Sequence, residues 1–552
     1  MNLILSLHSN MMYMKKITTL MVCLLITLSM QAQKVLKEAT FDPEGKAKIT
    51  NLSEVQIDEA NNQMVLFYLT KSTERKVKAE ILYFDLDFNY LKTESLEDDI
   101  EKVRQKYKLN WGWAWSSCKD ASEPLLTVEG NLFTGQITFK KGYIDTYYNW
   151  YTGFCDDKFR VEDKVKPKGE DGESLKLVNY WTNNDLLSYV RKTSTTHSGG
   201  GYTYSVRTYR PAKIVMNAEK GDVVICAQVF DKKNKKEFGK HYVFEKFSVA
   251  SMEKTKSTPL DFPVAATVLK YTFLSSGNVA YIFQRADNKY EYVEVAFDGT
   301  IERRNEIERP NGYHWFVYEM SEVGGDLYIH GLTGKNVAKA DKPNGYQIMK
   351  VLPNKIDWVT FTDIKEFKPT FVKIGEEKGK PFSGGILKIR DLHIGSTGNI
   401  FITAQKYTNG GGVQIGSQSL ASYQEVVAFN FDPKGKLLSN YSTKLRDKNE
   451  HNKVAPTEHA LLNTPAGDGV YWTVFEVAGE KKLGSTARML YYPRVTKISN
   501  DGKTTTEFLE IGGGKYYLDD AYPINKISNN TFIFIGSDRK GKNMWFSKVK
   551  FD

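Results

Sequence analysis

The sequence predicts an all-β protein built from repeated antiparallel sheets. Short apolar segments alternate with tight turns along most of the chain, and 13% of the residues are aromatic, a class that favours strands. The clearest stretch runs from residue 386 to 445, where four β-rich segments are joined by turn residues. A single sheet of this kind cannot bury both of its faces, so it requires similar neighbours.

A unit made of an apolar strand, a tight Gly/Asn/Asp turn and a second apolar strand occurs eight times in the sequence. The first unit joins residues 52–57 to 64–69, and the third is expected to join 212–216 to 223–230. Most units are followed by a second hairpin, with turns such as Asp298-Gly299, because glycine accepts positive φ at little cost. Four strands per unit, repeated along the chain, predict a β-propeller of four-stranded antiparallel blades.

Eight blades are expected, with seven as the alternative, because residues 97–210 do not divide cleanly and form an irregular insertion. Within it, residues 97–108 have helical spacing, and residues 180–189 belong either to the second blade or to a further unit. The last unit stops at its third strand, residues 544–551, while residues 34–41 provide a spare strand. Pairing these two strands would complete the last blade and close the ring, so residues 33–552 are expected to form one domain.

Two single hairpins are similar to repeats of known propeller families. The stretch from Gly324 to Gly331 resembles one kelch-type strand, and the stretch from Ser499 to Thr504 resembles the Asp-box of sialidase-like propellers. Each resemblance covers one hairpin, so no functional residue is transferred from either family.

Residues 1–32 have the pattern of a signal peptide. Lys15 and Lys16 precede an apolar stretch from residue 17 to 30, and a cleavage point follows Ala32. The segment resembles the signals of exported Bacteroidota proteins. No later stretch of the sequence is apolar over the length that a membrane span requires. An exported protein is therefore expected, in the periplasm or on the cell surface of a Gram-negative bacterium.

The formal charge of +10 is distributed over interspersed lysines and carboxylates rather than gathered in a basic block. This pattern favours a mixed-charge surface over a nucleic-acid site. Cys226 lies inside an apolar strand and is expected to be a buried small hydrophobe. Cys118 and Cys155 are the candidates for a disulfide, with two free thiols as the alternative.

Aromatic residues are densest in two stretches of the irregular insertion, and these are the candidate ligand- or partner-binding residues: Trp111, Trp113, Trp115, Tyr147, Tyr148 and Trp150. Tryptophans two apart share one face of a strand, where they can stack on sugar rings or anchor a protein partner. The alternative is that they pack the second blade against its own insertion.

Three histidines, His314, His330 and His393, lie on or beside predicted inner strands and are candidates to face a central channel. A satisfied core position is the alternative for each. The sequence contains no HExxH and no CxxC spacing, so no metal or other cofactor is expected. No GxSxG motif precedes a helix, which disfavours serine hydrolysis of that kind.

These observations favour an exported, non-catalytic β-propeller that binds a protein or a glycan of the cell envelope through its irregular loops. Two alternatives stay open. One is a polysaccharide hydrolase or lyase with its site at the channel mouth, and the other is an accessory subunit of an outer-membrane transport or secretion assembly.

Overall fold

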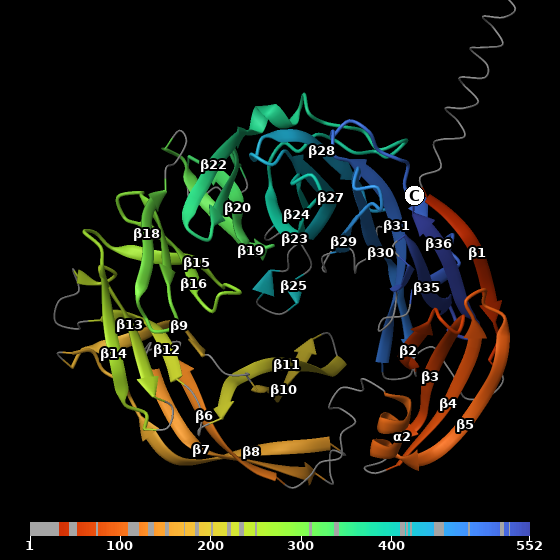
Figure 1. The fold of residues 1–552 in the computed structure, drawn as a ribbon, viewed down its shortest axis with the longest axis horizontal. Coiled ribbons are helices and arrows are strands. Elements are labelled where there is room, and N and C mark those ends of the chain that lie inside the picture. Colours follow the sequence, from red (N-terminus) through yellow and green to blue (C-terminus); the bar gives the residue numbers. More distant parts are fainter. Residues whose placement is uncertain are drawn as a thin grey trace, which may run out of the picture. The chain divides into compact units, whose positions relative to one another are not determined.

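A computed structural model describes residues 33–43, 52–72, 76–108, 121–130, 137–149, 154–170, 172–182, 187–199, 202–217, 222–230, 237–248, 251–307, 312–335, 342–408, 414–415, 418–419, 422–446, 457–483, 486–518, 524–528 and 530–551. The chain divides into two compact units. Unit 1 comprises residues 1–116, 363–413 and 419–552, and unit 2 comprises residues 117–362 and 414–418. Figure 1 shows the strands of both units.

The described residues of unit 1 form four antiparallel sheets. Their strands, in chain order, are β1 (Gln33–Phe41); β2 (Leu52–Asp58), β3 (Gln63–Ser72), β4 (Lys76–Asp85) and β5 (Tyr90–Asp99); β23 (Ile386–Ile394), β24 (Ile400–Thr408), β27 (Ser422–Phe431) and β28 (Leu437–Thr443); β29 (Glu458–Asn463), β30 (Gly469–Leu483), β31 (Thr486–Ser499) and β32 (Leu509–Glu510); and β33 (Tyr516–Leu518), β34 (Ile524–Ser528), β35 (Thr531–Asp538) and β36 (Met544–Phe551). The short helices of this unit are α2 (Ile100–Tyr107) and the 3-10 helix η5 (Ile364–Phe367).

The described residues of unit 2 also form four sheets. Their strands are β6 (Ala121–Gly130), β7 (Ile137–Asn149), β8 (Phe154–Val165), β10 (Leu187–Gly199) and β11 (Tyr202–Asn217); β9 (Ser174–Thr182), β12 (Asp222–Phe230), β13 (His241–Ser248) and β14 (Lys254–Asp261); β15 (Ala266–Phe273), β16 (Val279–Arg285), β17 (Tyr290–Val295) and β18 (Ile301–Ile307); and β19 (His314–Val323), β20 (Asp326–Gly334), β21 (Gly345–Leu352) and β22 (Lys355–Asp363). A separate two-stranded ribbon joins β25 (Gln414–Ile415) to β26 (Gln418–Ser419).

The predicted pairing of the first and last strands is present. In Figure 1, β1 lies beside β36, and the register runs from Lys34 opposite Lys550 to Phe41 opposite Met544. The sheet therefore follows the order β1-β36-β35, and the short strands β33 and β34 pair with different parts of β35. The expected four-stranded antiparallel pattern is confirmed for six sheets, and the other two contain five strands.

The predicted partner of β12 is wrong. We expected residues 212–216 to pair with 223–230, but those residues belong to β11, and β12 pairs with β9 and β13. The long strands β10 and β11 separate β9 from β12 in sequence, and β11 pairs with β10 and β6 instead. The predicted helical segment at residues 97–108 is confirmed in part as α2, which starts at Ile100.

Within each unit, neighbouring sheets pack face to face through their apolar residues. In unit 1, one core joins β24, β27 and β28 to β29–β31, and a second joins β29–β31 to the sheet of β35 and β36. In unit 2, one core joins β16 and β17 to β19–β21. No helix among the described residues is long and apolar enough to cross a membrane.

Candidate functional site

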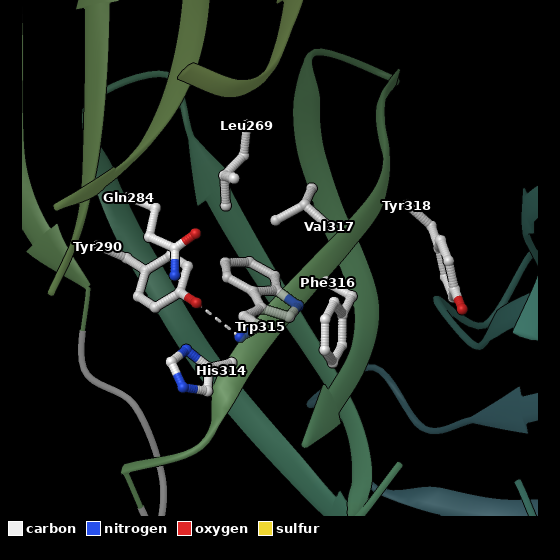
Figure 2. Close-up of a pocket in the computed structure, with 8 residues that line it drawn as sticks. All are labelled: Leu269, Gln284, Tyr290, His314, Trp315, Phe316, Val317 and Tyr318. Atoms are coloured by element: carbon white, nitrogen blue, oxygen red, sulfur yellow. Dashed lines mark hydrogen bonds between the residues drawn. The ribbon is translucent and has the colours of Figure 1, made fainter. Parts of the chain in front are cut away.

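The candidate site is a cavity of about 260 Å³ in unit 2, between the β15–β18 sheet and the β19–β22 sheet (Figure 2). β15 and β19 are edge strands of these sheets, because each pairs with one neighbour only. The cavity is lined by aromatic, aliphatic and two polar side chains: Leu269, Gln284, Tyr290, His314, Trp315, Phe316, Val317 and Tyr318.

Irregular pairing in both edge strands helps to position this lining. The register of β15 shifts between Val268 and Lys270, and that of β19 shifts between Val317 and Glu319. The residues left over by these shifts, Leu269 and Tyr318, both line the cavity. Bulges of this kind re-aim a side chain relative to the alternation of a regular strand, so the two strands present more side chains to the cavity than regular pairing would.

Tyr290 and Trp315 hold the two walls together. The backbone N–H of Trp315 donates a hydrogen bond of 2.8 Å to the hydroxyl of Tyr290, as Figure 2 shows. The ring centroids of these residues lie 6.3 Å apart. Tyr290 is 0% and Trp315 is 2% exposed, so close packing holds these two side chains of the lining in place. Gln284 and His314 are half-buried and supply the polar side chains of the lining.

The indole nitrogen of Trp315 is a buried donor. Within the described part of the chain, this Nε1–H has no hydrogen-bond partner. Buried polar groups in folded proteins are nearly always paired. Trp315 lines the cavity, but this nitrogen has almost no accessible surface, so it is not a donor that the cavity wall exposes.

The three predicted channel histidines have different surroundings. His314 lines the cavity. His330 is 0% exposed, and its Nδ1 lies 2.7 Å from the hydroxyl of Tyr346. Burial, assisted by the charge of Lys270, lowers the pKa of His330 to about 3, so this imidazole is neutral near pH 7. His393 belongs to unit 1, where it is half-buried on β23 opposite Phe401.

The predicted aromatic patch and the predicted disulfide involve residues or side chains that lie outside the described part of the chain. Trp111, Trp113, Trp115, Trp150 and Cys118 lie outside the described residues. The backbones of Tyr147 and Tyr148 belong to β7, where they pair with Asp156 and Cys155 of β8, but their side chains and that of Cys155 lie outside the described part. The patch and the disulfide therefore stay predictions.

Cys226 is a free, fully buried thiol on β12, and burial raises its pKa. Among the described residues, no group of three or more His, Cys, Asp and Glu side chains could hold a metal ion.

Unit 1 contains a second group of titratable side chains, where β23 lies beside β29. Arg390 forms an ion pair with Glu458, and the Leu461 N–H donates a 3.0 Å hydrogen bond to Asp391 Oδ2. Burial raises the pKa of Asp391, while burial and the charge of Arg390 lower that of His459 to about 3. These contacts connect two neighbouring sheets, and we assign them a structural role.

Sequence reasoning missed most of the cavity lining. Trp315 to Tyr318 were recognised only as a strand, and Gln284 and Tyr290 carried no signal, because they line the cavity through the packing of two sheets. The available signal was the density of aromatic residues between Tyr313 and Tyr318, on or beside a predicted inner strand.

Comparisons with known proteins give no family. No family model matches the chain, and no curated protein matches it. Solved structures with a similar arrangement include a Saccharomyces cerevisiae complex of Dbp5, Nup159 and Gle1 (7% identity, 94% of this chain and 95% of that chain, TM-score 0.25). A GH43 β-1,3-galactosidase matches at 10% identity (73% and 98%, TM-score 0.23), and a polysaccharide lyase at 10% identity (95% and 95%, TM-score 0.23). With TM-scores this low, we draw no functional argument from these likenesses.

Proposed function

We propose that this protein is an exported β-propeller that binds a saccharide in the cavity between the β15–β18 and β19–β22 sheets. The observation that carries the proposal is the composition of the lining, in which the aromatic side chains of Tyr290, Trp315, Phe316 and Tyr318 are combined with two polar side chains. Sugar rings present apolar C–H faces and polar edges, so they match a wall of aromatic rings with a few hydrogen-bonding groups.

The size of the cavity favours a single ring. Its volume of about 260 Å³ lies just below the range of about 300–1,000 Å³ that is usual for small-molecule pockets. Gln284 offers an amide donor and acceptor, and His314 offers an imidazole, so ring hydroxyls have partners on the polar part of the lining.

The lining supports binding more than hydrolysis. Glycoside hydrolysis normally requires two carboxyl groups flanking the bond that is cleaved. None of the eight lining residues is an aspartate or glutamate. Turnover of a polysaccharide in a panel of envelope and plant glycans, followed by reducing-end release and by absorbance of unsaturated products, would favour the enzyme alternative instead.

Binding is tested by calorimetric titration with methyl glycosides of common hexoses. We expect Phe316→Ala and Tyr318→Ala each to weaken binding about two- to tenfold, because an aromatic contact contributes about 0.5–1.5 kcal/mol. The matched control is Phe273→Ala, on the same edge strand as Leu269 but outside the lining, where the ring is 52% exposed. Equal affinities for all three variants and the unaltered protein, or no binding of any glycoside, would refute the proposal.

The propeller itself is part of this proposal. Its support is the set of eight sheets with four or five strands each, together with the pairing of β1 and β36. In a closed ring, β1 contributes the outer strand of the last blade and removes one exposed edge. Deletion of residues 34–41 should then lower the melting temperature by several degrees, and an unchanged melting temperature would argue against closure.

Export is proposed from the sequence pattern of residues 1–32 alone. Its test is N-terminal sequencing of the protein recovered from the native cell envelope. A mature chain that begins at Gln33 would support export, and a chain that retains Lys15 and Lys16 would contradict it.

A further inference from the structure

Gly331 lies within β20, beside the edge strand β19 that supplies residues 314–318 of the cavity lining. Its φ is not positive, in contrast to those of Gly324 and Gly325 in the turn between the two strands. The backbone conformation at this position is therefore open to other residues. Gly331 is also buried, so the absence of a side chain must have a reason in the packing.

The reason is the backbone of β19, which passes through the space that a side chain of residue 331 would occupy. A Cβ atom at this position would overlap the carbonyl oxygen of Phe316 and lie 3.0 Å from the backbone nitrogen of Tyr318. Ordinary contacts between carbon atoms are about 3.5–4.0 Å long. Because the overlapping atoms belong to the backbone, no rotation of a side chain relieves the overlap.

This close approach coincides with the bulge of β19. Val317 pairs with Gly331, and the next residue, Tyr318, is left over and lines the cavity (Figure 2). β15 contains a bulge too, but it lies opposite Ile282 and Phe283, which have large side chains. A bulge alone therefore does not require glycine in the neighbouring strand, whereas the path of β19 does.

A second glycine of β20, Gly334, makes room for the ring of Phe316. A Cβ atom at Gly334 would lie 3.3 Å from Cε2 of that ring, which is closer than an ordinary contact. The φ of Gly334 is not positive either. A small shift of the ring relieves this contact, so it is softer than the backbone overlap at Gly331. β20 thus accommodates the backbone of Phe316 at one glycine and its ring at the other.

We propose that Gly331 is a positioning residue of the cavity, an inference that rests on the saccharide-binding function proposed above. By leaving room for β19, it permits the bulge that adds Tyr318 to the lining and holds the backbone of Phe316 in place. A methyl group at residue 331 would push β19 away from β20 and displace both aromatic side chains. Gly331 is not part of the lining and acts only through these two residues.

The test compares Gly331→Ala with Gly469→Ala, by melting temperature and by calorimetric titration with the methyl glycosides named above. Gly469 begins β30 in unit 1, and a Cβ atom there would overlap the carbonyl oxygen of Ile498. Both variants should melt several degrees lower, because each forces two strands apart. Only Gly331→Ala should also weaken glycoside binding, by at least about tenfold, because two aromatic contacts are lost.

Gly334→Ala provides a graded second variant. Since the ring of Phe316 can shift to relieve the contact, glycoside binding should weaken only about two- to threefold. A larger loss of affinity for Gly334→Ala than for Gly331→Ala would contradict the dominant role of the backbone overlap.

Deletion of Tyr318 tests the link between Gly331 and the bulge without any sugar. Removing the extra residue should restore regular pairing, in which an antiparallel strand has room for a side chain at residue 331. In this background, Gly331→Ala should leave the melting temperature almost unchanged. Equal losses with and without Tyr318 would mean that the glycine and the bulge are independent. The deletion also supplies a folded background if Gly331→Ala alone fails to fold.

The possible failures are distinguishable. An unchanged affinity of Gly331→Ala, or an equal loss of affinity in Gly469→Ala, overturns the positioning role while the saccharide-binding function stands. Absence of glycoside binding by the unaltered protein overturns that function and the role in binding together, and the deletion of Tyr318 then still decides whether Gly331 holds the bulge.

Discussion

The edge strands β18 and β28 differ in how their unpaired backbone groups are kept from pairing with another chain. β18 in unit 2 pairs with β17 alone among the described residues, and its sequence is mainly charged, with Glu302, Arg304 and Glu306 exposed. β28 in unit 1 occupies the equivalent place in its own sheet, yet every residue except Leu438 is buried. An uncovered edge invites pairing with another chain, and charge or a covering segment prevents it. This protein uses charge at β18 and a covering segment at β28.

The covering segment comprises residues 364–382 and runs along β28. The Asn440 N–H donates to the Thr370 carbonyl at 3.0 Å, and the Val372 N–H donates to the Asn440 carbonyl at 2.9 Å. The rings of Phe367 and Phe382 pack on each other and on Phe429, with centroids 5.2–5.3 Å apart. The edge is therefore paired and sealed by apolar contacts.

A buried ion network holds the end of this segment. Arg494 Nε lies 3.0 Å from Glu476 Oε2, and Arg494 Nη1 lies 3.0 Å from Glu377 Oε1. The side chains of Arg494 and Glu476 are fully buried. Arg446 reaches Glu377 at 3.0 Å and Glu510 at 2.5 Å. The network joins the covering segment to the end of β28 and to the β29–β32 sheet.

Arg494→Met at the covered edge should cause the largest loss in the free energy of unfolding, compared with a matched change at β18. Because this change leaves the Glu476 carboxylate buried without its ion-pair partner, it should lower the free energy of unfolding of unit 1 by about 3–5 kcal/mol. Urea denaturation measures the loss. Lys289→Met, which removes an ion pair with Glu306 in which both side chains are about half exposed, should cost less than about 1 kcal/mol. Equal losses would mean that the buried network adds nothing to the covered edge.

A smaller effect is expected from Asn440→Ala. The amide of Asn440 donates to the Phe367 carbonyl at 2.6 Å and to Thr370 Oγ1 at 3.1 Å, and it accepts from the Phe382 N–H at 3.2 Å. Removal of this amide should lower the free energy of unfolding by about 2 kcal/mol, because its buried hydrogen-bond partners become unpaired. Hydrogen exchange of the β28 amides should become faster. Asn305→Ala on β18, where the side chain is exposed, is the matched control and should leave exchange unchanged.

The smallest effect concerns pH. Burial would raise the pKa of Glu377, but the hydrogen bond from Thr443 and the charges of Arg494 and Arg446 outweigh it, so its pKa lies below the ordinary 4.5. A carboxyl with a lowered pKa stabilises the fold above its unfolded pKa and loses this contribution as the pH falls through the folded value. We expect about 1 kcal/mol to be lost in this way below pH 4.5.

Melting temperatures measured from pH 7 to 3 test this expectation. Glu377→Gln should be less stable than the unaltered protein at pH 7, and the difference should shrink below pH 4.5. Glu306→Gln, at an exposed position of β18, should give a curve parallel to that of the unaltered protein. A constant difference for Glu377→Gln across the whole range would contradict a role for its ionised form.

Local sequence patterns predicted much of the strand architecture. The alternation of apolar residues and the Gly/Asp turns located the hairpins β2–β3, β15–β16, β23–β24 and β27–β28, since the strands of each pair are joined by a short connection. The partner of β12 could not be found this way, because β9 is separated from it by the β10–β11 excursion. The covering of β28 also carried no local signal, since residues 364–382 bond to it through backbone groups, while Phe367 and Phe382 pack on Phe429 of β27.

The candidate site was predicted only in part. His314 was named because it lies on or beside a predicted inner strand that could face a central channel, and it lines the cavity. Trp315 was missed because a buried tryptophan in a strand is typical of a core, and its place in the cavity lining follows from the packing of two sheets.

The antiparallel contact of β1 with β36 has a consequence for biosynthesis. The two strands are separated by roughly 500 residues, and the entropic penalty of joining them grows only as the logarithm of that length. The greater constraint is time, because Gln33–Phe41 leaves the ribosome long before Met544–Phe551 exists. Throughout translation the early strand must stay unpaired and protected from aggregation, and its sheet is finished only by the last residues made.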